Sequence, residues 1–353
     1  MRRCGLERDP EAGTTLVISE RPEGRRAGFE GLVTCGSVWM CPVCAAKVAA
    51  KRAEELAPVL DAVHARGGSA LMLTLTIRHS AGDRLGLTKD ERERRYVLDR
   101  RRRWRNRLDK IDARRMDRET AEAKGWDVDE HQADADDINE ASIRRDIAKS
   151  DPEFAAVGPA ARAQCDADTR ELAELNDRRG CWDAVTDAWA AATGGRDWAQ
   201  GQDEAALLGW VRVTEVTDGG TPAMLAGLPE GHGYSGNGWH VHLHVLLCFA
   251  ADVSTDYVAA KLAAGMHARW ARKARQLGFD SSEEHGWDLR KTRRGDGHNL
   301  HSYFVKQAHE VTGGHRKEGK RQGGRTPMQL LADAVETYRA EDMTRWWVYG
   351  AVA

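Results

Sequence analysis

The pattern of apolar and polar positions becomes regular in the stretch AAKVAAKRAEELAPVLDAVHARGG (45–68). Its alanines and leucines recur at helical spacing and it ends in Gly-Gly, so it predicts a helix. The β-branched and apolar run SALMLTLTIRH (69–79) predicts a strand. From Thr88 to about Gly180 charged residues dominate, which predicts a weakly buried helical insertion with disorder in part of 127–153.

Regular patterns resume in the second half of the chain and alternate between strand and helix. In order, they predict a helix near 182–192, strands at 207–217 and 238–249, a helix at 254–278, a strand at 286–292, and helices at 300–311 and 325–353. This order suits an α+β fold with a ferredoxin-like antiparallel sheet and helices on one face. The strands at 207–217 and 238–249 are expected to lie side by side.

The predicted strand GWHVHLHVLLCF (238–249) carries histidines at every second position. His240, His242 and His244 therefore share one face, while the valines and leucines between them share the other. Glu215 on the neighbouring strand is expected within reach of this row. Two imidazoles and a carboxylate form a nitrogen and oxygen donor set that suits Mn²⁺ or Mg²⁺ acting as a Lewis acid. The alternative is a row of polar residues on the solvent face of a half-buried strand.

A second group of polar residues lies in LHSYFVKQAHEV (300–311). On a helix, Tyr303, Lys306, Gln307 and Glu310 share one face. A phenol placed there can act as a nucleophile, and an ammonium group can stabilise a phosphate. The alternative is a tyrosine that only packs.

The N-terminal part of the chain contains a Cys-Pro-Val-Cys knuckle. Cys41 and Cys44 leave half a tetrahedron to be completed, and Cys35 and Cys4 are the natural completing pair, which predicts a closed structural Zn²⁺ site. The alternative is four free buried thiols. The remaining cysteines lack ligand spacing; they are Cys165, Cys181 and Cys248.

Composition narrows the class of protein. No apolar run reaches the roughly 20 residues of a membrane helix, no secretory signal opens the chain, and the seven cysteines are an odd number. These features predict a protein of the reducing cytoplasm. The formal net charge is −2, but residues 89–118 carry 14 Lys+Arg against 7 Asp+Glu, and residues 290–325 carry 10 against 3. Any nucleic-acid surface is therefore local.

Two basic stretches are candidates for binding DNA. The stretch 91–110 interleaves arginines with Tyr96 and Trp104, which suits phosphate binding and base stacking but equally a solvated helix laced with ion pairs. HRKEGKRQGGR (315–325) is the second; its candidate DNA-binding residues are Arg316, Lys317, Lys320 and Arg321.

Several of these motifs occur together in a known superfamily. LTLTIRH (73–79), VRVTEVTDG (211–219), NGWHVHLHVLL (237–247) and SYFVKQ (302–307), preceded by CGSVWMCPVCAAK (35–47), resemble plasmid rolling-circle replication initiators of the HUH endonuclease superfamily. The resemblance covers both ends of the chain, and the stretch 90–180 has no counterpart in it.

The resemblance implies a metal-dependent DNA nickase. Its two motif histidines fall on His242 and His244, its acidic ligand on Glu215 and its nucleophile on Tyr303, with His240 beside the ligands. The tyrosine would attack a phosphodiester of single-stranded origin DNA, presented in a hairpin, and leave a 5′-phosphotyrosyl link and a 3′-OH. A host helicase and polymerase would be partners.

One position departs from this family. Some relatives carry a glutamate one helical turn before the tyrosine to activate the water that ends the reaction, and here Asn299 occupies that position. Asp296, His298 and Glu310 are candidate replacements.

The expected domain organisation follows from these motifs. A zinc-binding segment and helix would span 1–66, the nuclease domain 67–325 with the insertion at about 88–180, and a C-terminal helix, cut short, 326–353. A transposase or relaxase of the same superfamily is a second reading. A zinc-stabilised DNA-binding repressor, in which the histidines hold a structural metal and Tyr303 only packs, is a third.

Overall fold

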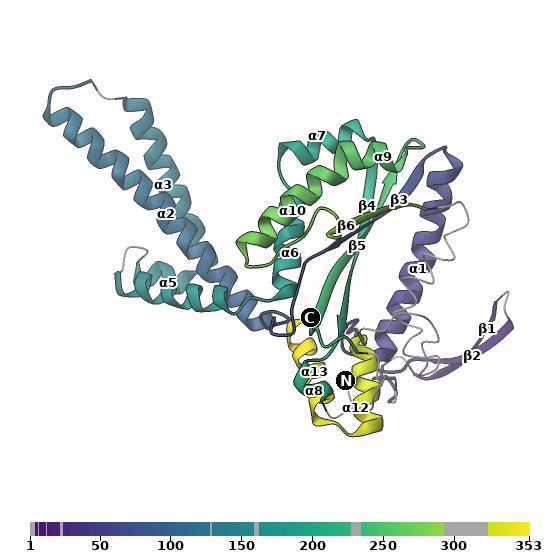
Figure 1. The fold of residues 1–353 in the computed structure, drawn as a ribbon. Coiled ribbons are helices and arrows are strands. Elements are labelled where there is room, and N and C mark those ends of the chain that lie inside the picture. The colour runs from purple at the N-terminus through teal and green to yellow at the C-terminus, as the bar shows by residue number, and fades with distance from the viewer. Residues whose placement is uncertain are drawn as a thin grey trace. The chain divides into compact units, whose positions relative to one another are not determined.

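The computed structural model describes residues 4–5, 7–11, 13–21, 24–127, 129–158, 162–226, 234–292 and 324–353. The chain divides into two compact units. The first unit combines Met1–Gly86 with Gly180–Ala353, and the second is Leu87–Arg179. Figure 1 shows the helices and strands of both units.

The first unit is built on a four-stranded antiparallel sheet (Figure 1). Its leucine-rich and β-branched strands occur in the spatial order β4-β5-β3-β6, and β4 pairs with β5 as the sequence predicts. The strands are β3 (Ser69–Thr76), β4 (Leu207–Asp218), β5 (Trp239–Phe249) and β6 (Trp287–Lys291). The antiparallel sheet of an α+β fold is therefore confirmed, although the strand expected at 69–79 ends at Thr76.

One face of this sheet forms the main core. The residues between the histidines of β5 point into it together with Leu71, Leu73 and Leu75 of β3. Helices α6 (Cys181–Ala192), α7 (Arg196–Glu204), α9 (Thr255–Val258) and α10 (Ala264–Gln276) gather on this side (Figure 1), and a π-helical turn, Ala259–Ala263, joins α9 to α10. Trp270 of α10 is fully buried, and its indole Nε1 donates to the carbonyl oxygen of Thr76 at 3.2 Å.

The opposite face is partly covered by helix α1 (Pro42–Ala65). Leu60 and Val63 of α1 pack against Leu246 and Cys248, which follow the histidines on their face of β5. The expectation of helices on one face is therefore wrong. The physical reason is that the second half of β5 is apolar on both sides, so that both sides require a cover.

The first unit also contains an N-terminal hairpin, two C-terminal helices and a short helix after β4. An N-terminal hairpin, β1 (Thr15–Arg21) and β2 (Gly24–Glu30), was not predicted. The helix expected at 325–353 is two helices, α12 (Pro327–Thr337) and α13 (Ala340–Val352), separated by Tyr338 with φ +54°. A short helix, α8 (Pro222–Leu225), follows β4.

In its described residues, 87–127, 129–158 and 162–179, the second unit forms four helices. Helix α2 begins after Thr88, where the charged stretch of the sequence begins, because Thr88 and Glu91 form a capping box there. The expected disorder in part of 127–153 is wrong for the residues that form α3. The helices are α2 (Lys89–Ala123), α3 (Glu130–Ser150), α4 (Pro152–Val157) and α5 (Arg162–Asp177). Their apolar contacts include Trp104, Leu108 and Ile111 against Ile143, Ile147 and Phe154.

None of the helices in the described part of the chain is both long and apolar enough to cross a membrane. The helix expected at 300–311 lies outside the described residues.

Candidate metal centres and their surroundings

Strands β4 and β5 bring Glu215 directly opposite His242, and His244 follows on the same face. Both imidazole Nε2 atoms contact Glu215 Oε2, His242 at 2.8 Å and His244 at 2.9 Å. Ligand bonds of about 2.1 Å at right angles place neighbouring donors about 3 Å apart, so the observed spacing fits one divalent ion. The three side chains could therefore hold a metal ion.

The electrostatics of this group suit a cation. Burial acts to raise the pKa of the Glu215 carboxyl, but the hydrogen bonds of His242 and His244 outweigh it and hold the pKa well below its ordinary value. The carboxylate is therefore charged at neutral pH. An anionic oxygen beside two imidazoles is a donor set that hard divalent ions accept.

Thr74 supports His244 from the neighbouring strand. β3 pairs with β5 so that Thr74 lies opposite His244, and Thr74 Oγ1 is 3.0 Å from His244 Nδ1. A hydroxyl can donate or accept, so this bond orients the ring whether or not Nδ1 carries a proton. Thr74 was not among the predicted site residues, although the alternation in LTLT could have placed it on the histidine face.

His79 was also missed, and it contacts the first histidine of the row. Its Nε2 lies 2.6 Å from His240 Nδ1, and its Nδ1 lies 3.0 Å from the carbonyl oxygen of Asn237. Burial, together with the nearby rings of His242 and His79, lowers the pKa of His240 to about 4. His240 is not among the three residues whose donor atoms lie within 4.8 Å of one another.

The four N-terminal cysteines lie together as the sequence predicts. Cys4 Sγ is 3.3 Å from Cys44 Sγ and 3.4 Å from Cys41 Sγ, and Cys35 Sγ is 3.7 Å from Cys44 Sγ. A tetrahedral zinc with 2.3 Å bonds separates its sulfurs by about 3.8 Å, so these four thiols could bind such an ion.

The thiols differ in how readily they ionise. The backbone N–H of Ser37 lowers the pKa of Cys35 to about 7, whereas burial raises the pKa values of Cys41 and Cys44. A cation at the centre would compensate that burial by favouring thiolates. Outside the cluster, burial raises the pKa of Cys181 to about 12, which agrees with its exclusion from the predicted ligands.

The predicted nucleophile and its basic neighbours lie outside the described residues. These are Tyr303 and Lys306, with Arg316, Lys317, Lys320 and Arg321, and the same holds for Asn299 and its candidate replacements. The chain is described again from Gly324. Arg325 pairs with Asp218 at the end of β4 through two backbone hydrogen bonds of 2.7 and 2.8 Å.

Three arginines of the basic stretch 91–110 bind carboxylates outside α2, and Arg102 and Arg103 bind Asp99 within this helix. This favours the ion-paired helix over the DNA-binding surface that the sequence left equally open. The pairs between α2 and the following helices include Arg94 with Glu171, Arg101 with Asp151 and Asp168, and Arg105 with Asp168.

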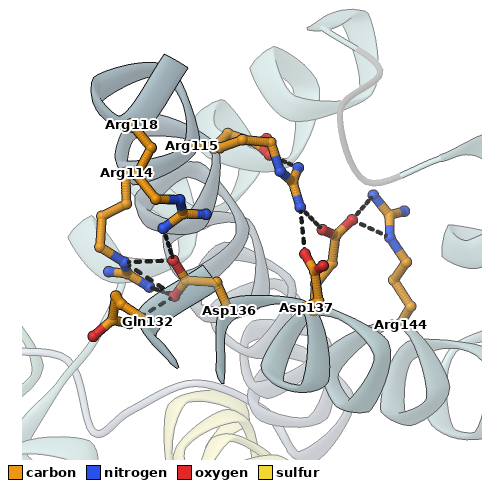
Figure 2. Close-up of polar contacts among 9 residues, drawn as sticks. Arg114, Arg115, Arg118, Gln132, Asp136, Asp137 and Arg144 are labelled. Atoms are coloured by element: carbon orange, nitrogen blue, oxygen red, sulfur yellow. Dashed lines mark hydrogen bonds and ion pairs between the residues drawn. The ribbon is translucent and has the colours of Figure 1, made fainter. Parts of the chain in front are cut away.

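The ion pairs continue toward the far end of α2 (Figure 2). Asp136 of α3 is completely buried and accepts hydrogen bonds from Arg114 at 2.6 Å, Arg118 at 2.7 Å and Gln132 at 3.2 Å. A buried carboxylate is tolerated here because two guanidinium groups neutralise it. Guanidinium groups engaged in this way are not free to bind phosphates.

Comparison with known proteins finds partial relatives. The chain is 40% identical over 77 residues to Protein rep of Streptomyces lividans, and 40% identical over 77 residues to the neomycin resistance protein of Streptomyces cyanogenus. Each match covers 22% of this chain, and the matches span only 16% and 17% of the two relatives. No family model matches the chain, and no solved structure matches it. The chain is therefore similar to a Rep protein over part of its length.

Proposed function

We propose that this protein is a metal-dependent DNA nickase and strand transferase that starts rolling-circle replication of a plasmid. The observation that carries the proposal is the convergence of Glu215, His242 and His244 on one sheet face, with donor atoms within 4.8 Å of one another. The similarity to Protein rep supports the connection with replication.

Glu215, His242 and His244 would hold Mn²⁺ or Mg²⁺. When bound, the ion supplies positive charge to the non-bridging oxygens of the phosphate under attack. Thr74 keeps the His244 ring in place for this role.

The reaction is an exchange of phosphodiester partners. The Tyr303 hydroxyl attacks the phosphorus, its oxygen forms the new P–O bond, and the bond to the 3′ oxygen breaks. The proton lost by the phenol is balanced by the proton that the released 3′ oxygen gains. Lys306 would favour the phenolate, and Arg316, Lys317, Lys320 and Arg321 would hold the DNA strand.

The residues from Gly324 onward lie at the end of β4 that carries Glu215. Asp218 lies three positions after Glu215 on β4, and Arg325 is bound to it through backbone hydrogen bonds and a 3.7 Å side-chain ion pair. Arg345 of α13 also donates to Asp218, from Nε at 2.7 Å. Two arginines of the C-terminal part therefore neutralise Asp218 close to the candidate metal ligands.

We also propose a structural role for Cys4, Cys35, Cys41 and Cys44 as zinc ligands. Cys41 directly precedes α1 and Cys44 lies in its first turn, so the ion would tie the N-terminal segment to the start of this helix. Zinc content after purification should be one per chain and should fall in Cys44→Ser. Equal zinc content in both proteins would contradict this role.

The test of the nickase uses a pool of single-stranded oligonucleotides with Mn²⁺. Wild type should form a covalent protein–DNA adduct on a denaturing gel, whereas Tyr303→Phe, His242→Ala and EDTA-treated protein should form none. Tyr257→Phe is a matched control on α9 and should keep the adduct. The sequence of the trapped DNA would identify the origin, on which a host helicase and polymerase are expected to follow.

The same experiment separates the other readings. A transposase or relaxase would also form the adduct, but with DNA from a transposon end or a conjugative origin. A DNA-binding repressor would bind DNA without any adduct. Because its histidines would hold a structural metal, His242→Ala would lower its metal content and its thermal stability. Absence of an adduct across the whole pool would overturn the nickase proposal.

A further inference from the structure

We propose that His79 is a positioning residue that fixes the tautomer of His240, so that His240 carries its proton on Nδ1 and presents an unprotonated Nε2 beside the candidate metal centre. The assignment of the tautomer stands on hydrogen bonds alone. Its consequence for metal binding rests on the proposed function.

The first step follows from the carbonyl oxygen of Asn237. A carbonyl oxygen only accepts hydrogen bonds, and it lies 3.0 Å from His79 Nδ1. His79 Nδ1 must therefore carry a proton. A neutral imidazole has one N–H, so His79 Nε2 is left as an acceptor.

The second step follows from the distance between the two rings. His79 Nε2 and His240 Nδ1 are 2.6 Å apart, which requires a hydrogen bond between them. Since His79 Nε2 accepts, His240 Nδ1 donates. The single proton of neutral His240 is then on Nδ1, and its Nε2 keeps a lone pair.

His240 lies next to His242, one of the candidate metal ligands. The rings of His240 and His242 have centroids 4.7 Å apart, so His240 adjoins a candidate metal ligand on the same strand face. An unprotonated nitrogen there can accept a hydrogen bond from water or another hydroxyl that approaches the centre. A protonated Nε2 would instead present an N–H to a site built for a cation.

The backbone around His79 keeps the pair together. His79 follows β3, and its neighbour Arg78 is held by a backbone hydrogen bond to Asp280 at 2.6 Å. Asn237 lies two residues before the start of β5. The two contacts of His79 thus join the segment after β3 to the segment before β5, at the end of the sheet that carries the histidines.

The chain offers a matched pair of substitutions. In His79→Gln, the side-chain amide keeps a donor (its NH2) and an acceptor (its carbonyl oxygen), as the neutral imidazole has one N–H donor and one nitrogen acceptor. His79→Phe keeps the ring and removes both hydrogen bonds. A purely packing role for His79 would be preserved by phenylalanine, whereas a role in fixing the tautomer would be preserved by glutamine.

The test is long-range ¹H–¹⁵N NMR of the full chain labelled with ¹⁵N-histidine, at pH 8, above the ordinary pKa of histidine. His240→Asn identifies the His240 signals. Wild type and His79→Gln should show His240 protonated on Nδ1, and His79→Phe should show both tautomers. The Kd for Mn²⁺, measured by calorimetry, should rise about tenfold in His79→Phe and stay within about twofold in His79→Gln.

The outcomes are distinct from those of the nicking assay. A proton on His240 Nε2 in wild type, or an unchanged His240 tautomer in His79→Phe, would overturn the inference whether or not the protein nicks DNA. The expected tautomers without any Tyr303 adduct would overturn the nickase and leave the positioning role standing.

Discussion

Removal of Arg101 should selectively destabilise the helical unit Leu87–Arg179. The Arg101 side chain is 9% exposed, and its Nε and Nη2 donate to Asp151 at 2.7 and 2.9 Å. Its Nη1 lies 3.5 Å from Asp168, whose side chain is fully buried. Arg101→Met keeps much of the apolar stem but removes the guanidinium from both carboxylates. Asp151 then keeps the N–H of Phe154, and Asp168 keeps Arg105 and Gln164. Breaking a buried ion pair from one side costs about 3–5 kcal/mol.

Hydrogen exchange followed by mass spectrometry measures this cost separately for each unit. A free-energy difference of 1.36 kcal/mol changes an equilibrium constant tenfold. If the free energy of opening the helical unit falls by about 3 kcal/mol, the amide exchange that requires this opening therefore accelerates roughly a hundredfold. Peptides of α2 and α4 should show this acceleration in Arg101→Met, while peptides of β3 and β5 should exchange as in wild type.

Two further variants make the measurement specific. Arg102→Met breaks an exposed pair with Asp99 within α2 and should change exchange by less than about fivefold, because exposed pairs contribute little. Arg101→Met with Asp151→Asn removes one of the stranded charges, keeps a side chain that can cap α4, and should recover part of the loss. Acceleration below about fivefold in Arg101→Met would refute the claim that this buried network stabilises the unit.

Two other predictions concern the stability of the helical unit at low pH and the affinity of the candidate metal centre for Mn²⁺. Arg114 holds the pKa of Asp136 below its ordinary value near 4, and Arg101 does the same for Asp151. The stability that these two ion pairs provide is therefore complete above that value and is lost as the pH falls below it. Calorimetric unfolding of the helical unit should shift to lower temperature between pH 6 and pH 3, and less so in Asp136→Asn; equal shifts would contradict the pairing. Thr74→Val removes the hydroxyl that contacts His244 and should weaken Mn²⁺ binding about tenfold. The control is Thr76→Val, which should leave the Kd unchanged because the Thr76 hydroxyl bonds to Ile77 instead. Equal Kd values for both variants would rule out support of His244 by Thr74.

Local patterns predicted most elements of the sheet unit. The alternation in β5 assigned the histidines to one face and Val241, Leu243 and Val245 to the other, and the structure shows this arrangement. Adjacent pairing of β4 and β5 then placed Glu215 beside His242 without further information. The cysteine spacing likewise predicted the four thiols that now lie together.

Other features could not be predicted because they depend on contacts between distant segments. The break at Tyr338 interrupts a continuous helical pattern, and α3 forms in a stretch whose acidic composition suggested disorder. Helix α3 can bury the carboxylate of Asp136 because Arg114 and Arg118 of α2 neutralise it. The composition of the stretch does not reveal this pairing.

By itself, the sequence determined which side chains share a face and which residue types could bind a cation, because the periods of strand and helix are local properties of the backbone. Only the tertiary structure decided that Thr74 and His79 support His244 and His240, and that α1 covers the second half of the histidine face. Those contacts depend on strand register and on where loops return to the sheet. Packing of the whole unit sets the strand register and the places where loops contact the sheet, so no single stretch of sequence encodes either.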